Sequence, residues 1–178
     1  RLRRFVATLS PRAILALGWV GLVLYAFPGY MSFDSVFQLH EARTGEFSDG
    51  HPPAMSALWR VVELVIAGPL GMLVVQTVCF LWGTYLIVRT RITHRGAAVV
   101  AVLLLWFPPV SNTMAVIWKD SQMAGFLMLG TGCLLSNRLR VRLLGLGLLA
   151  VGTAMRHNAL AMTLPLIVLL FVWSVAHR

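Results

Sequence analysis

The feature that most constrains this chain is a series of six apolar runs, and two of the intervals between them are short and rich in arginine. The runs cover roughly 13–27, 70–88, 96–107, 121–136, 143–155 and 159–175. Mean hydropathy is +0.81 and only 12% of residues are charged, whereas a soluble domain is nearer a quarter charged. An apolar helix can cross a bilayer because it satisfies its own backbone hydrogen bonds. The sequence therefore predicts an all-α, polytopic transmembrane helix bundle with six spans.

The basic residues indicate how such a bundle would be oriented. Eleven of the 15 fall at the termini or on alternate loops: Arg1, Arg3, Arg4, Arg12, Arg89, Arg91, Arg95, Arg138, Arg140, Arg142 and Arg178. This bias is typical of cytoplasmic segments. All six acids would lie on the other side. The net charge of +9 is thus explained by membrane orientation, and no nucleic acid partner is needed.

The interval 28–69 is predicted to be an extracytoplasmic loop that contains two short juxtamembrane helices. The first would run from Asp34 to Arg43, with Gly45 as its stop. The second would begin at the double proline 52–53, since proline suits a first helical turn, and end near Ile66. Its polar positions fall on one stripe: Ser56, Arg60 and Glu63. This pattern favours a helix in the outer interface and not a seventh span.

Two motifs in this loop carry a family resemblance. Asp34 directly follows the first apolar run, and the segment 48–53 reads Ser-Asp-Gly-His-Pro-Pro. Together with the two-helix loop, they resemble the GT-C superfamily of membrane glycosyltransferases, especially protein O-mannosyltransferases and their bacterial relatives. The resemblance covers roughly residues 13–90. It implies that the chain is the N-terminal part of a longer protein, residues 1–178 of a GT-C-like module.

The resemblance implies an inverting glycosyltransferase in the bacterial cell membrane. Its partners would be a polyprenyl-phosphate-linked sugar donor, membrane lipid, and a glycan, lipid or protein acceptor at the outer face. Many relatives carry Glu after the first Asp where this chain has Ser35. No cofactor is therefore assigned, and a divalent metal is left open.

Such a transfer needs a base for the acceptor hydroxyl and positive charge against the leaving phosphate. The candidate catalytic acids are Asp34 and Asp49. The candidate substrate-binding residues are His51, Lys119, Asp120 and Arg156. The last three adjoin short apolar runs, so they are expected near the outer headgroup level, where a charge must face a partner or a wet cavity.

Each candidate also has a structural interpretation. Asp34 would serve as a helix N-cap, Asp49 as a turn acid before glycine, and His51 as a polar tip at the interface. Lys119 and Asp120 would pair at a helix start, and Arg156 would only join two helices. At the level of the whole chain, the alternative to an enzyme is a transporter or lipid-handling scaffold without chemistry. A transport pathway places charges near the bilayer midplane, whereas the acids here collect at one face.

Overall fold

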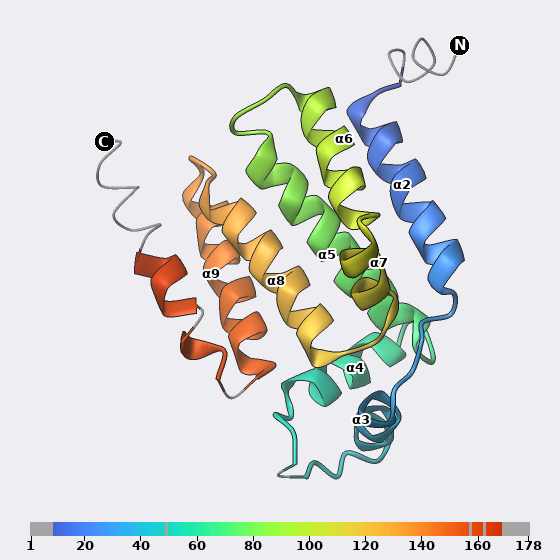
Figure 1. Ribbon diagram of the computed structural model, residues 1–178. Coiled ribbons are helices and arrows are strands. Elements are labelled where there is room, and N and C mark those ends of the chain that lie inside the picture. The colour runs from blue at the N-terminus through green and yellow to red at the C-terminus, as the bar shows by residue number, and fades with distance from the viewer. Residues whose placement is uncertain (1–8, 49, 157, 162, 169–178) are drawn as a thin grey trace.

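The computed structural model describes residues 9–48, 50–156, 158–161 and 163–168, and in these ranges it is helical without named strands. The helices, labelled as in Figure 1, are α2 (Pro11–Ala26), α3 (Phe33–Thr44), α4 (Ala54–Glu63), α5 (Leu70–Val88), α6 (His94–Leu105), α7 (Pro108–Ala115), α8 (Lys119–Leu134) and α9 (Leu139–Ala154). The predicted all-α class is therefore confirmed.

Five of these helices form a row in the order α2, α6, α5, α8, α9, while α3 and α4 lie across one end (Figure 1). Glycine allows the closest approaches within the row. A Cβ at Gly83 of α5 would collide with the backbone of α8, and one at Gly145 of α9 would meet the carbonyl of Gly130. Small residues at the contacts between helices let the helix backbones approach each other closely.

The chain bends by 70° between α6 and α7. Pro108 and Pro109 cause this break, since they occupy the first two positions of α7 and cannot continue α6. Between the apolar runs 96–107 and 121–136 the sequence predicts an outer loop over 110–119, and the structure corrects this to a short helix followed by an extended segment. A buried amide from α5 holds that segment, because Gln76 Nε2 donates to the carbonyls of Met114 and Val116 at 2.8 and 3.0 Å.

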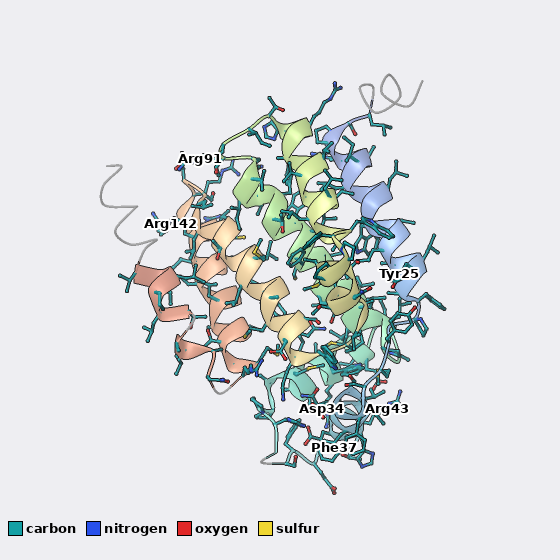
Figure 2. All side chains as sticks on the ribbon, in the orientation of Figure 1. Tyr25, Asp34, Phe37, Arg43, Arg91 and Arg142 are labelled. Atoms are coloured by element: carbon teal, nitrogen blue, oxygen red, sulfur yellow. The ribbon has the colours of Figure 1, made fainter. Side chains whose placement is uncertain are left out.

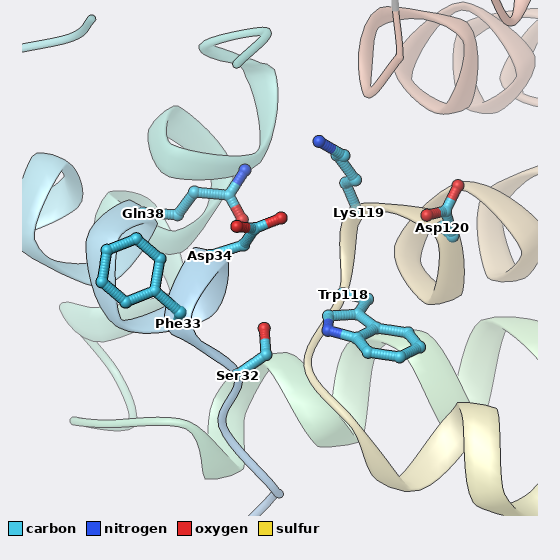
Figure 3. A pocket seen from close by; sticks show the side chains of 7 residues that line it. All are labelled: Ser32, Phe33, Asp34, Gln38, Trp118, Lys119 and Asp120. Carbon is cyan, nitrogen blue, oxygen red and sulfur yellow. The ribbon is translucent and has the colours of Figure 1, made fainter. Parts of the chain in front are cut away.

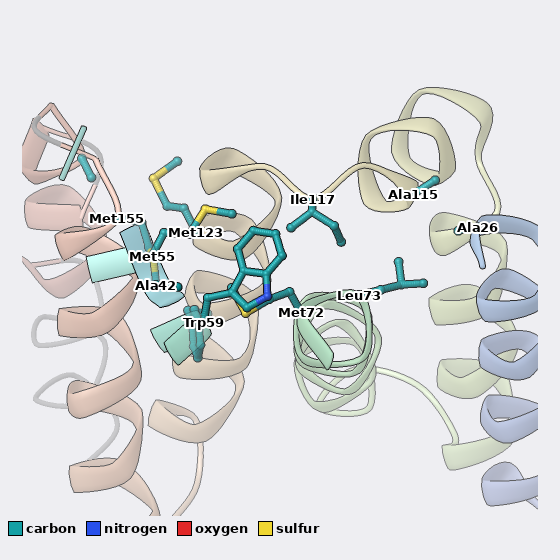
Figure 4. Close-up of a cluster of buried hydrophobic side chains, with 12 residues drawn as sticks. Ala26, Ala42, Met55, Trp59, Met72, Leu73, Ala115, Ile117, Met123 and Met155 are labelled. Carbon is teal, nitrogen blue, oxygen red and sulfur yellow. The ribbon is translucent and has the colours of Figure 1, made fainter. Parts of the chain in front are cut away.

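A buried cluster joins the row of helices to α4 (Figure 4). Trp59 of α4 lies at its centre with Met55, Met72, Ile117 and Met155 around it, and all five are fully buried. The indole Nε1 of Trp59 donates to a backbone carbonyl at 3.1 Å, so its one polar group is satisfied. This cluster fixes α4 against the end of the bundle.

Two of the three polar positions of the α4 stripe, Ser56 and Glu63, contact α3, whereas Arg60 is exposed. Ser56 is buried against α3, and Glu63 accepts hydrogen bonds from the Arg43 guanidinium at 2.5 to 3.2 Å. At the end of α3, Gly45 adopts φ +80°, a conformation that glycine allows and that stops the helix. The two short helices predicted for the interval 28–69 are therefore present and pack on each other.

The basic segments that contain Arg91 and Arg142 lie at one end of the helices, and the interval that contains Asp34 lies at the opposite end (Figure 2). Figure 2 shows Arg91 and Arg142 at one end and Asp34, Phe37 and Arg43 at the opposite end. The placement of the basic loops and the acidic loop on different sides of a membrane stays a prediction.

Helix length and composition identify fewer candidate membrane spans in the described part of the chain than the six predicted. Among the described helices, α5 is long and apolar enough to cross a membrane by itself, and the bent pair α6–α7 would be a second if taken together. The helices α2, α8 and α9 have 16 residues each, about 24 Å of rise against a hydrocarbon core of about 30 Å. The predicted span 159–175 lies only partly within the described residues, which include 159–161 and 163–168. The six-span bundle stays a prediction.

Candidate functional site

A short backbone bridge assembles the site from distant parts of the chain. The Tyr30 carbonyl accepts a hydrogen bond from the Ile117 amide at 2.9 Å, and the Tyr30 amide donates to the Ala115 carbonyl at 3.0 Å. The Ser35 hydroxyl adds a hydrogen bond to the Ile117 carbonyl. These contacts hold the first turn of α3 beside the segment that leads into α8, although the two are more than 80 residues apart.

Asp34 lies in the first turn of α3 but does not cap it. Ser32 is the N-cap, and its hydroxyl accepts from the Ser35 amide while the Ser35 hydroxyl accepts from the Ser32 amide. This reciprocal pair is a capping box. The Asp34 carboxylate is therefore not used by the helix end, and its side chain is 51% exposed. The structural interpretation of Asp34 as the N-cap is wrong.

His51 lies between Asp34 and Lys119. The Lys119 ammonium is 3.0 Å from His51 Nδ1, and His51 Nε2 is 3.9 Å from Asp34 Oδ1. An ammonium only donates, so Nδ1 accepts and the ring hydrogen of the neutral imidazole is on Nε2, facing the carboxylate. The edge of the ring packs against Phe37. The three polar side chains thus lie in a line, with a hydrogen bond between Lys119 and His51 and a longer approach of 3.9 Å from His51 to the Asp34 carboxylate.

Asp120 and Arg156 form an ion pair next to this line of side chains. Arg156 Nη1 donates to Asp120 Oδ1, and the two side chains remain 42% and 39% exposed. Asp120 therefore orients Arg156, whereas Lys119 points to His51. An exposed pair of this kind contributes about 0–1 kcal/mol to folding, so the arrangement is not explained by stability alone.

A polar cavity of about 360 Å³ lies between α3 and the start of α8 (Figure 3). Asp34 and Gln38 approach it from α3, and Lys119 and Asp120 approach it from the opposite side. Trp118 lies along its edge with a partly exposed indole. The cavity thus presents a carboxylate, an ammonium, an amide and an aromatic ring to one small ligand.

The structure also has an apolar groove of about 610 Å³. It is lined by Pro52 and Pro53, by α9, and by Leu160, Thr163, Leu164 and Ile167, and half of its lining residues are leucine or alanine. Arg156 lines this groove and binds Asp120, which lines the polar cavity. The ion pair therefore links one residue of the groove to one residue of the polar cavity.

Glu41 is a residue of this region that the sequence analysis did not single out. Its carboxylate is 2% exposed and accepts from the Ser48 amide and hydroxyl at 2.9 and 2.7 Å and from the Ser56 hydroxyl at 2.7 Å. Burial raises the pKa of Glu41, but the hydrogen bonds from Ser56 and Ser48 outweigh burial and leave the pKa below its ordinary value. Glu41 thereby fixes the start of the loop that carries His51.

Replacing Glu41 by Gln is expected to lower the free energy of unfolding by about 3 kcal/mol at pH 7, since buried hydrogen bonds to a charge are lost. Because the folded-state pKa is lowered, this contribution is present above the unfolded pKa of about 4.3 and disappears as pH falls through the folded pKa. Thermal midpoints of the purified protein and of Glu41→Gln should therefore converge between pH 7 and pH 3.

Glu46→Gln is the matched control for this experiment, because Glu46 is exposed and only its backbone amide forms a hydrogen bond. Its midpoint should follow that of the unaltered protein at every pH. A constant difference between Glu41→Gln and the unaltered protein across this range would contradict the charged role of Glu41.

The structure brings together five of the six candidate residues. The side chains of Asp34, His51 and Lys119 lie in one line, and Asp120 and Arg156 lie beside it. Asp49 lies outside the described residues. Gln38 and Glu41 were missed, although each follows the previous polar position of α3 by one helical turn, at 34, 38 and 41. Within the described ranges, no three His, Cys, Asp or Glu side chains come together as a metal site.

Comparison with known proteins gives no further guide to this site: no family model, no curated protein and no solved structure matches the chain.

Proposed function

We propose that this chain is part of a membrane glycosyltransferase that moves a sugar from a polyprenyl-phosphate donor to an acceptor at the outer face of a bacterial membrane. The single observation that carries the proposal is that one ion pair links a cavity with charged side chains to an apolar groove. The cavity is lined by Asp34 and Lys119, and the groove is lined by Arg156, which binds Asp120 of the cavity. A lipid-linked sugar has the same division into a polar head and an apolar chain.

The apolar groove suits an isoprenoid chain, whose burial contributes about 0.8 kcal/mol per CH₂ group. An isoprenoid chain in the groove would place its phosphate beside Arg156. Arg can bind two phosphate oxygens at once. Lys119 would add a second positive charge from the other side of Asp120.

The reaction follows from this placement. The acceptor hydroxyl gives its proton to the Asp34 carboxylate as its oxygen bonds to the anomeric carbon of the donor. The bond between that carbon and the phosphate oxygen breaks, and the polyprenyl phosphate leaves with the bonding electrons. Attack from the face opposite the phosphate inverts the anomeric centre. His51 lies near Asp34 and contacts Lys119, so it lies between the base on one side of the cavity and the cation on the other.

The alternative is a transporter or lipid-handling scaffold. It would also bind a lipid phosphate, but it would need no base in the polar cavity. The capping geometry favours the enzyme, because the helix end is satisfied by Ser32 and Ser35 and leaves Asp34 directed at the cavity.

Binding of short prenyl compounds tests the donor class. Purified protein in nanodiscs should bind farnesyl phosphate at least tenfold more tightly than farnesol, because a phosphate forms charge-assisted hydrogen bonds with Arg156 and Lys119. Microscale thermophoresis measures both affinities. Equal affinities would contradict a phosphate-bearing donor.

Cysteine labelling in intact cells tests the orientation. Cys79 and Cys133 are first replaced by Ala, and single cysteines are introduced at the exposed positions Glu46 and Arg91. A membrane-impermeant maleimide is expected to label position 46 and to reach position 91 only after lysis. Labelling of position 91 but not 46 in intact cells would reverse the proposed topology.

A further inference from the structure

Gln38 has a buried hydrogen-bond donor without a partner. Its side chain is 1% exposed, and Nε2 forms no hydrogen bond with any residue that the structure describes. An unmade hydrogen bond of a buried donor costs about 1–3 kcal/mol. A Met or Leu would fill the same volume without this cost, so packing alone does not account for the amide.

The position of Gln38 indicates where a partner would come from. Gln38 is one helical turn beyond Asp34 on α3, and both line the polar cavity (Figure 3). The missing acceptor is therefore best supplied by a ligand in that cavity.

The other groups of the cavity define the chemistry of the ligand. Asp34 accepts hydrogen bonds, Lys119 donates them, and Trp118 offers an apolar ring face. A sugar combines hydroxyl groups that donate and accept with C–H faces that pack on aromatic rings. A cavity of about 360 Å³ is large enough for one such ring.

We infer that Gln38 is a sugar-recognition residue whose Nε2 donates to a sugar hydroxyl in the cavity beside Asp34. This inference rests on the proposed function, since it assumes that the cavity receives a sugar. It goes further in assigning the recognition to a buried amide that serves no other residue. The sugar is either the one on the donor or one on the acceptor, and the experiment distinguishes them.

The test uses Gln38→Met, which keeps the volume and removes the amide. Affinities of the purified protein in nanodiscs are measured for farnesyl phosphate, for farnesyl-phosphate mannose and glucose, and for the methyl glycosides of both sugars with farnesyl phosphate bound. We expect Gln38→Met to weaken binding of at least one sugar compound by about three- to tenfold. Affinity for farnesyl phosphate should be unchanged, and the thermal midpoint should be unchanged or higher.

Gln122→Met is the matched control. Gln122 is equally buried, but its Nε2 donates to the Met72 carbonyl and to Gln76 Oε1 at 3.1 and 2.8 Å. This substitution should lower the thermal midpoint and leave the ratio of sugar-lipid to prenyl phosphate affinity as it was.

The outcomes separate the inference from the proposed function. If Gln38→Met binds the farnesyl-phosphate sugars more weakly, Gln38 recognises the donor sugar. If it binds only the methyl glycosides more weakly, Gln38 recognises the acceptor sugar. Unchanged affinities for every sugar compound, or a lower midpoint as with Gln122→Met, would overturn the role of Gln38 while the donor class stands. Failure of the unaltered protein to bind any prenyl phosphate would overturn the proposed function, and the inference with it.

Discussion

Replacing Asp34 by Asn is expected to reduce sugar transfer by about 100-fold or more, the usual scale for loss of a general base. The amide keeps the size and hydrogen bonding of the carboxylate but cannot take the acceptor proton. Folding should be little affected, because Ser32 and not Asp34 caps α3 and the Asp34 side chain is half exposed. Initial rates of transfer from a prenyl-phosphate sugar measure the effect, with the thermal midpoint measured in parallel.

Asp49→Asn is the comparison that decides between the two candidate acids. Asp49 lies in the same loop as His51 and is the other acid proposed from the sequence. If Asp34→Asn kept near-normal turnover while Asp49→Asn abolished it, the base would be Asp49 and the assignment of Asp34 would be wrong.

Replacing Arg156 by Ala is expected to weaken binding of farnesyl phosphate by about 10- to 100-fold, since hydrogen bonds to a charged group contribute about 1.5–3 kcal/mol. The affinity of Arg156→Lys for farnesyl phosphate should lie between that of the unaltered protein and that of Arg156→Ala, because Lys keeps the charge but loses the bidentate geometry. The loss of stability should be small, at most about 1 kcal/mol, because the ion pair with Asp120 is partly exposed.

Asp120→Asn separates phosphate binding from a purely structural ion pair. It breaks the pair but keeps the Arg156 charge, now without a competing carboxylate. We expect farnesyl phosphate to bind as tightly as before or more tightly. If Arg156→Ala and Asp120→Asn both lowered the thermal midpoint and neither changed affinity, Arg156 would serve only to join α8 to the end of α9.

Helix boundaries could be predicted where local chemistry decides them. The apolar run 70–88 matches α5, and Gly45 ends α3 as expected from its freedom to adopt positive φ. The prolines at 108–109 were expected to end a helix, and they do, but they also begin α7. That second role depends on the backbone contacts that hold the chain after the bend, and these contacts have no local signal.

The candidate site was predictable in its residue types but not in its connections. Charged residues beside short apolar runs indicated Lys119, Asp120 and Arg156. The sequence did not show that Lys119 would contact His51 or that Asp120 would bind Arg156, because those pairings follow from the backbone bridge and from the packing of α8 on α9. The buried polar face of α3 was missed for a similar reason, since it requires α4 as its partner.

The most direct test of the central claim is to follow a prenyl-phosphate sugar in proteoliposomes containing the purified protein, with prenyl phosphate and the glycosylated acceptor quantified by mass spectrometry. The proposed function predicts equal amounts of both products, inversion at the anomeric carbon, and loss of both with Asp34→Asn. Intact donor that only changes leaflets would contradict an enzyme and indicate a lipid transporter.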